Sequence, residues 1–261
     1  MYERALQGLE KAFGLHHKDT LAIINSLGLL YSRRGQQEVA QAMLEQAVKG
    51  VEKLKGPDHP HTLTTIYNLG TIYARRVQLE DAKIMYERAY EGRKKVLGAD
   101  HPQTLSLVHS MGLLYHKRGR LEDAKIMYER ALQGFQKVFG PGHRDILMTT
   151  SYLADIFKDQ GQLENAMMMC ERILQAHDTM LEPSVLEFLV PALNRLQTLA
   201  CLFQEHGEEF KAISCYQQAQ NGFLTVFGPD DERDAYLYGQ ISSLRSSVEE
   251  LFISPGAAGK V

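Results

Sequence analysis

An eleven-residue stretch, LEDAKIMYERA, occurs twice in this chain without a single change. It occupies residues 79–89 and again residues 121–131, so the two copies start 42 residues apart (121 − 79). A shorter stretch, MYERALQG, likewise stands at residues 1–8 and 127–134. Chance does not produce identities of this length, so the chain is built from internal repeats, and the repeat unit is what limits its fold.

Several columns of similar residues recur with the same period and have helical spacing. Leu27, Gly28 and Tyr31 stand at i, i+1 and i+4, and Ala40 and Ala47 are seven residues apart, which places each group on one helix face. A turn glycine separates the two runs in four of the five units, at Gly35, Gly119, Gly161 and Gly207, and Val77 takes its place in the second unit. Each unit is therefore predicted to be helix, tight turn, helix and connector.

The motifs of this unit resemble the tetratricopeptide repeat. Leu-Gly-x-x-Tyr at residues 27–31 suits its first helix, and Ala-x-x-x-Tyr-x-x-Ala at residues 82–89 suits its second. The longer unit, with YERAL and the connector LGADHPQTL at residues 97–105, resembles the repeats of kinesin light chains and the repeat tails of fungal and bacterial NB-ARC-type proteins. The resemblance implies an all-α, right-handed superhelical solenoid that acts as a non-enzymatic protein–protein interaction scaffold.

We expect a single solenoid over residues 1–252, followed by a flexible tail at residues 253–261. A four-residue insertion is expected near residues 182–191, where the pattern is least regular. The predicted parts of the solenoid are a half-repeat at 1–14, repeats at 19–54, 61–97, 103–139, 144–181 and 184–227, and a capping helix at 231–252.

The first unit holds only a second helix, so its apolar residues Leu6, Leu9 and Phe13 lack their usual first-helix neighbour. Either this face is capped in another way, or the chain has been cut from a longer parent. We expect homodimerisation through this N-terminal half-repeat.

Composition narrows the classes of partner and compartment. The net charge of −3 gives no general attraction to nucleic acid or acidic membranes, and no apolar run is long enough to span a bilayer. The start of the chain does not read as a signal peptide. Cys170, Cys201 and Cys215 are odd in number and contain no CxxC, which favours small core residues in a reducing, cytoplasmic setting.

No catalytic or cofactor motif was found, so we expect no enzyme activity and no cofactor. The connector residues Asp58, His59 and His61 could suggest metal ligands. Since the DHP turn returns at residues 100–102, at the same joint, we interpret it instead as a helix start in which Asp and Thr cap the helix and Pro stands near its first turn. We therefore expect no metal.

The resemblance places the first helices on the concave face of the solenoid. There a column of like charge stands at Arg33, Arg75 and Lys117, followed by Asp159 and Glu205 in the last two repeats. We expect a protein or peptide ligand with acidic residues to bind beside the basic rungs. The residues predicted to form the peptide-binding groove are Asn25, Leu29, Arg33, Tyr67, Asn68, Thr71, Arg75, His109, Leu113, His116, Lys117 and Asp155. Only Asn25 and Asn68 match the asparagines with which kinesin light chain repeats hold a peptide.

Two alternatives remain open. The groove could serve as a reaction pocket, with polar groups from Tyr67, His109, His116 and Asp155. The chain could also be a self-association module of a larger signalling protein.

Overall fold

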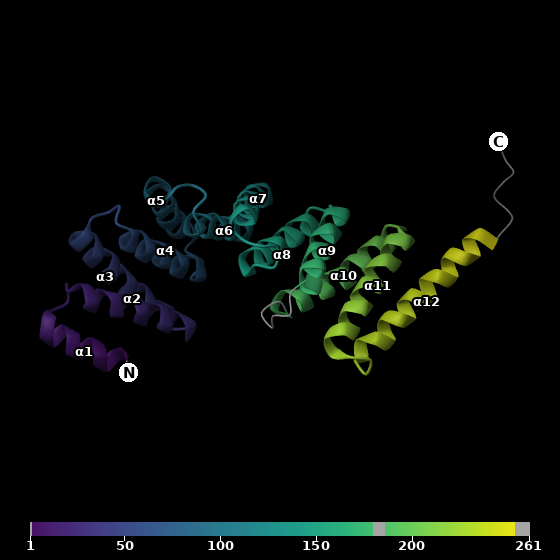
Figure 1. Ribbon diagram of the computed structural model, residues 1–261, viewed down its shortest axis with the longest axis horizontal. Helices are drawn as coiled ribbons and strands as arrows, with labels where there is room; N and C mark the ends of the chain where they lie inside the picture. Colours follow the sequence, from purple (N-terminus) through teal and green to yellow (C-terminus); the bar gives the residue numbers. More distant parts are fainter. Residues whose placement is uncertain (1, 180–185, 254–261) are drawn as a thin grey trace. The chain divides into compact units, whose positions relative to one another are not determined.

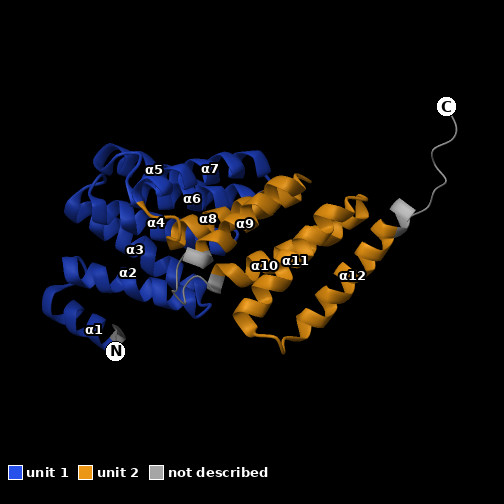
Figure 2. Cartoon of the chain, turned by 45° about the vertical axis from the view of Figure 1, so that its right-hand side comes forward, with its two compact units in different colours: residues 1–138 blue, residues 139–261 orange. Residues whose placement is uncertain are grey.

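The computed structural model describes residues 2–179 and 186–253, and every regular element in these ranges is an α-helix. The chain forms two compact units, residues 1–138 and residues 139–261, which are coloured separately in Figure 2. The prediction of one continuous solenoid over residues 1–252 stays a prediction. Residues 254–261 of the predicted tail and residues 182–185 of the predicted insertion lie outside the described residues.

Unit 1 is a series of helix pairs joined by connectors (Figure 1). The helix α2 packs on α3, α4 on α5 and α6 on α7, while α1 packs on α2. Successive pairs are joined by contacts of α3 with α4 and of α5 with α6. The bounds are α1 (Tyr2–Phe13), α2 (Lys18–Arg33), α3 (Gln37–Lys55), α4 (Pro60–Arg75), α5 (Leu79–Leu97), α6 (Pro102–Lys117) and α7 (Leu121–Val138).

Unit 2 continues the pattern with α8 packed on α9, α10 on α11 and α12 on α11. Its helices are α8 (Arg144–Asp159), α9 (Leu163–Thr179), α10 (Leu186–Glu205), α11 (Glu209–Phe227) and α12 (Glu232–Ile253). Pro191 lies inside α10, in its second turn, where it leaves one backbone carbonyl without its helical donor.

The apolar columns form the core, as their helical spacing predicts. In α4, Leu63, Ile66, Leu69 and Ile72 recur every three residues and are all buried. Full burial of each such side chain stabilises the fold by about 1.5–3 kcal/mol. Gly112 of α6 permits a close approach within its pair, because a Cβ atom there would lie 2.9 Å from the ring of Tyr128 in α7.

The tight turns within the repeats need a left-handed backbone. Gly119 adopts a φ of 71°, and Val77, which replaces glycine in the second repeat, adopts a φ of 62°. A β-branched residue disfavours this region strongly, and the Val77 side chain is also 74% exposed, so it gains little from packing. The turn after α4 is therefore strained.

The connectors differ from the sequence-based prediction in one respect. The Nδ1 atom of His59 accepts a hydrogen bond from the backbone N–H of His61 at 3.1 Å, and His101, His17 and His143 act in the same way at the other joints. The prediction that aspartate caps the helix is wrong: histidine is the N-cap, and Asp58 instead binds Lys95 Nζ at 2.7 Å.

The threonine of the connector also has another role than the one predicted. Thr62 Oγ1 donates to the Gly56 carbonyl at 2.8 Å, which ties the start of α4 to the end of α3. The prediction of proline near the helix start is confirmed by Pro60 and Pro102, which stand in the first turns of α4 and α6.

The three cysteines are free, with Cys170 and Cys215 buried. Among the helices of the described residues, none combines the length and the apolar character needed to cross a membrane.

Candidate functional site

The first helices of unit 1, α2, α4 and α6, carry eleven of the twelve predicted site residues. The repeat period explains this placement, because residues 42 apart occupy the same position in successive helix pairs. The helix α4 contacts both α2 and α6, so these side chains form one row of neighbouring rungs.

Neutral hydrogen bonds join the rungs from one first helix to the next. Asn68 Nδ2 donates to Asn25 Oδ1 at 3.0 Å, which links α4 to α2. The hydroxyl groups of Tyr67 and Ser110 lie 3.0 Å apart and link α4 to α6. Since both asparagines are partly satisfied by each other, their first role is to fix the register of α2 against α4. Only their remaining donors and acceptors could meet a ligand.

The predicted basic column is exposed to solvent. Arg33, Arg75 and Lys117 all lie on the surface, and among the described residues none of the three forms an ion pair. Arg75 is held in place by one neutral contact, in which Nη1 donates to Ser32 Oγ of α2 at 2.9 Å. The column therefore presents three positive charges whose carboxylate partners are not supplied by the described part of the chain.

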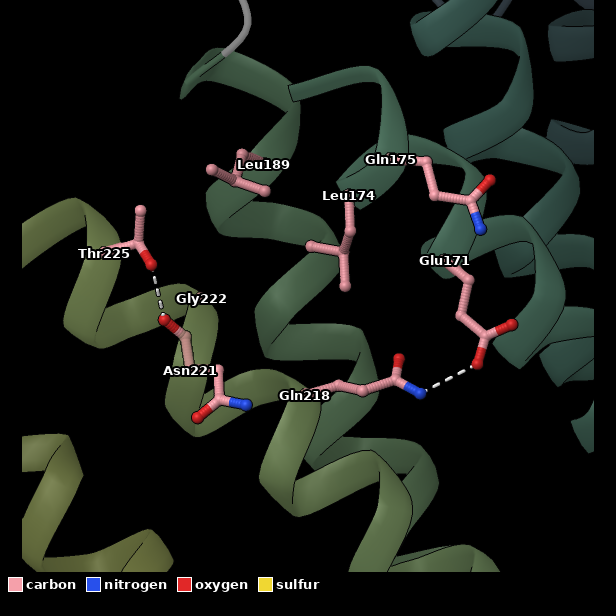
Figure 3. A pocket seen from close by; sticks show the side chains of 8 residues that line it. All are labelled: Glu171, Leu174, Gln175, Leu189, Gln218, Asn221, Gly222 and Thr225. Atoms are coloured by element: carbon pink, nitrogen blue, oxygen red, sulfur yellow. Dashed lines mark hydrogen bonds between the residues drawn. The ribbon is translucent and has the colours of Figure 1, made fainter. Parts of the chain in front are cut away.

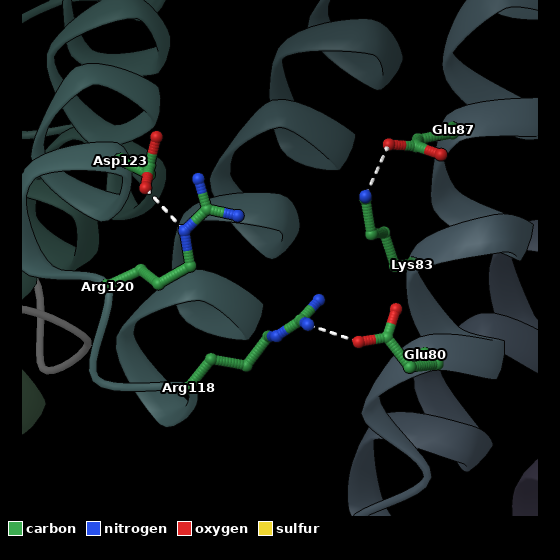
Figure 4. A network of polar contacts seen from close by, with 6 residues as sticks. All are labelled: Glu80, Lys83, Glu87, Arg118, Arg120 and Asp123. Carbon is green, nitrogen blue, oxygen red and sulfur yellow. Dashed lines mark hydrogen bonds and ion pairs between the residues drawn. The ribbon is translucent and has the colours of Figure 1, made fainter.

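On α4 and α6 the next residue along the helix behaves differently, whereas on α2 the next residue, Arg34, is exposed. Arg76 Nη2 binds Glu38 of α3 at 3.1 Å, and Arg118 binds Glu80 of α5 in the same manner (Figure 4). These arginines connect each first helix to the second helix of the preceding repeat. Arg76 and Arg118 thus join neighbouring helices of the unit, whereas Arg33, Arg75 and Lys117 beside them face solvent.

Tyr67 is half-buried, and its ring is held by contacts with two side chains of α5. The Arg93 guanidinium of α5 lies 4.9 Å from the centre of the Tyr67 ring, and the Tyr86 ring stacks at 5.8 Å. Arg93 is itself buried, donates Nη1 to the Gln103 carbonyl at 2.7 Å, and has its pKa lowered by that burial. This arrangement holds the tyrosine ring in one orientation at the middle of the row.

The remaining predicted residues of unit 1 are half-buried, apart from His109. Leu29 packs against the core cluster of the unit, and Thr71 donates to the Tyr67 carbonyl at 3.1 Å and accepts from Tyr86 at 3.3 Å. Leu113 and His116 stand on α6 with part of each side chain exposed.

His109 is not a surface residue, so its predicted place in the groove is wrong. Its side chain is only 5% exposed and packs against the Tyr128 ring, with the ring centres 5.1 Å apart. Burial lowers the pKa of His109 to about 4, so the imidazole is neutral near pH 7. The residue belongs to the contact between α6 and α7.

Asp155 is the one predicted residue in unit 2, on α8. Its carboxylate forms a bidentate ion pair with Arg195 of α10, in which Arg195 Nε lies 2.5 Å from Oδ1 and Nη2 lies 2.7 Å from Oδ2. The charge of Asp155 is therefore already matched inside the unit, and its place on the ligand surface stays a prediction.

Sequence reasoning missed three residues that shape this surface, Ser32, Arg93 and Ser110, and it missed Arg195, the partner of Asp155 in unit 2. The serines stand in variable columns and carry no signal of their own. Arg93 could have been found, since its column otherwise reads Val51, Phe135, His177 and Phe223, and a charge in a mostly apolar column is informative.

The comparisons with known proteins agree with this architecture. The family model of the MalT-like TPR region matches residues 3–222 of this chain. The chain belongs to this family of tetratricopeptide repeat proteins. The match confirms the tetratricopeptide prediction.

One similar structure is a crystal structure of kinesin light chain-type, nearly identical TPR-like repeats from Podospora anserina. It superposes on this chain with a TM-score of 0.66 at 23% identity, and the match covers 82% of this chain and 99% of that one. The structure of BtubC (BKLC) from P. vanneervenii gives a TM-score of 0.70 at 17% identity, covering 88% and 91%. A Rap protein complexed with competence and sporulation factor gives 0.61 at 13% identity, covering 95% and 70%. These likenesses show the fold. No curated protein sequence matches the chain.

Proposed function

We propose that this repeat protein is a non-enzymatic interaction scaffold that binds an acidic peptide segment across α2, α4 and α6 of unit 1. The observation that carries the proposal is the difference between two adjacent basic columns. Arg76 and Arg118 are matched by carboxylates of their own unit, whereas Arg33, Arg75 and Lys117 are exposed and form no ion pair among the described residues. A partner that supplies carboxylates could pair with the exposed column of Arg33, Arg75 and Lys117.

The repeat geometry sets the spacing of the expected ligand. Packed helices lie about 8–10 Å apart, and an extended chain advances about 3.3 Å per residue. Acidic residues about three positions apart in an extended peptide would therefore meet successive rungs. A ligand with a single acidic residue could satisfy only one of them.

Charge alone does not give a useful affinity. An exposed ion pair contributes only about 0–1 kcal/mol, so apolar contact must add to it. Leu29, Tyr67 and Leu113 each expose part of an apolar side chain on the same three helices, and Tyr67 is already held by Arg93. A rigid aromatic ring loses little conformational entropy when a ligand packs on it. The basic rungs would chiefly set register and association rate.

The alternative of a reaction pocket receives no support from the four residues considered for it. His109 is buried against Tyr128, and the Asp155 carboxylate is engaged by Arg195, so neither side chain is available as an exposed acid or base. The Rap protein of the same fold was solved with a factor bound, which supports a binding role for the present chain.

Affinity capture from the native source with three matched baits tests the proposal. The baits are the wild type, the triple variant Arg33→Glu, Arg75→Glu, Lys117→Glu, and a control with Asp159→Lys and Glu205→Lys in unit 2. We expect partners that bind the wild type and the control to be lost from the triple variant, and to contain acidic segments. Partners retained by the triple variant but lost from the control would overturn the placement on unit 1.

A further inference from the structure

A pocket of about 450 Å³ lies within unit 2, between α9, α10 and α11. It has two polar walls, Glu171 and Gln175 from α9 and Gln218, Asn221 and Thr225 from α11. Leu174 and Leu189 lie between these walls, as Figure 3 shows. The lining contains a carboxylate, carboxamides and aliphatic carbon, and no lysine or arginine.

The residue at position 218 can be compared with the residues at the corresponding positions of the other repeats. Position 218 corresponds to positions 46, 88, 130 and 172 once the four-residue insertion is counted; position 46 is glutamine, and positions 88, 130 and 172 are arginines. In unit 1, Arg88 extends from α5 to Glu52 of α3, and Arg130 extends from α7 to Asp100 in the connector before α6. Each arginine thus fills the joint with an earlier segment of the chain and meets a carboxylate there. Gln218 is shorter and neutral, so the guanidinium is missing from the corresponding joint of unit 2.

The pocket supplies two acceptors of its own, on Gln218 and Glu171. Gln218 Nε2 donates to Glu171 Oε1 at 2.8 Å, which turns the amide so that Oε1 is its free end. Gln218 Oε1 is buried and has no hydrogen-bond partner among the described residues. A buried acceptor without a donor is destabilising, and a bound ligand with N–H groups would satisfy it.

From these observations we infer that the α9–α10–α11 pocket is a binding site for an arginine side chain of a partner protein. The guanidinium donates to Gln218 Oε1 and to the Glu171 carboxylate. Its methylene stem packs against Leu174 and Leu189. Guanidinium suits this site better than ammonium, because its planar fork can donate to two acceptors at once.

The probe for the test is N-acetyl-arginine methylamide, followed by NMR through the side-chain amide of Gln218 and the backbone amide of Gly222. N-acetyl-citrulline methylamide has the same shape without the charge and serves as the matched ligand. We expect saturable shifts with arginine, with Kd in the millimolar range, and binding of citrulline at least about fivefold weaker.

Three variants complete the test. Gln218→Arg restores the residue of repeats two and three and should abolish probe binding by filling the site, while Glu171→Gln should weaken binding at least about fivefold. Glu164→Gln removes a charge from the same helix outside the pocket and should leave binding unchanged. Equal binding of arginine and citrulline, undiminished binding to Gln218→Arg, or no saturable shift of the Gln218 and Gly222 signals would overturn the inference. None of these results depends on the basic column of unit 1.

Discussion

The two units build the same repeat and place their charges in opposite ways. On the first helices of unit 1, the rungs are joined by neutral bonds such as Asn25–Asn68, and the charges of the basic column stay in solvent. On the first helices of unit 2, a charged pair, Asp155–Arg195, makes the link between α8 and α10. A variable column of the repeat can thus either stay in solvent or serve internal cohesion, and the partners of each side chain show which.

The first prediction sharpens this contrast through stability. Arg195→Met should lower the free energy of unfolding by about 3 kcal/mol, because Asp155 is only 26% exposed and would be left as an unmatched charge. Urea denaturation followed by circular dichroism measures the loss.

Arg88→Met in unit 1 is the matched control. Arg88 and Glu52 are each 36% exposed, so breaking this pair should cost under about 1 kcal/mol. If both substitutions destabilise the protein equally, the charged link of unit 2 has no special role in its cohesion.

The second prediction uses pH. The pKa of His109 in the folded protein is about 4, below the ordinary value of 6.5, so the unfolded chain binds more protons between these values. Stability should be highest above pH 6.5 and fall as the pH is lowered toward 4, by about 2 kcal/mol between pH 7 and pH 5. Thermal melts across this range report the slope.

His109→Ser, which installs the residue of repeat four, should flatten the slope between pH 7 and pH 5. The exposed His16, changed to Ser, is the control and should leave the slope as it is. An unchanged slope in His109→Ser would show that this histidine is not held neutral by the fold.

Sequence patterns were sufficient for the architecture and insufficient for the site. The helix pairs, the apolar columns such as Leu63 and Leu69, and the proline starts follow from periodicity, which the fold must obey at every repeat. The identity of the N-cap did not follow, because Asp58 and His59 are adjacent and either can accept from a helix N–H. Only the structure shows that His59 is the residue that accepts this hydrogen bond.

The candidate site failed at residues whose environment depends on neighbours distant in sequence. His109 stands in a column that elsewhere reads Asn25 and Tyr67, yet it turns into the contact with Tyr128. Asp155 has the expected place on its helix, but its partner Arg195 lies 40 residues away and in no recognisable column. Periodicity reports the face of a residue, and it does not report the partner.

The third prediction concerns the turns. Those of unit 2 use glycine, whereas unit 1 carries Val77 at a φ of 62°. Val77→Gly should therefore raise the free energy of unfolding by about 1 kcal/mol, by removing left-handed strain. The reverse change at the matching turn, Gly119→Val, should lower it by about the same amount. Urea titrations of the two variants should move in opposite directions; a destabilised Val77→Gly would show that the turn is not strained.

The smallest expected effect is self-association through the N-terminal half-repeat, which we retain as a proposal. Leu6 packs into the core of the first repeat, so less apolar surface is free than the sequence suggested. Phe13 remains 59% exposed, stacked on His17 with ring centres 4.7 Å apart, and Leu15 lies beside it. Weak dimerisation at high concentration should disappear in Phe13→Ser. Light scattering that gives a monomer at every concentration would remove the proposal.

The most direct test of the central claim is the affinity of an acidic partner segment, measured by fluorescence anisotropy at low and high salt. With the wild type and with the unit 2 reversal Asp159→Lys, Glu205→Lys, binding should be similar and should weaken as salt is raised. With Arg33→Glu, Arg75→Glu, Lys117→Glu, binding should fall at least about a hundredfold, since three attractions become repulsions. An affinity that is unchanged in the triple variant and lost in the unit 2 reversal would contradict the assignment of recognition to unit 1.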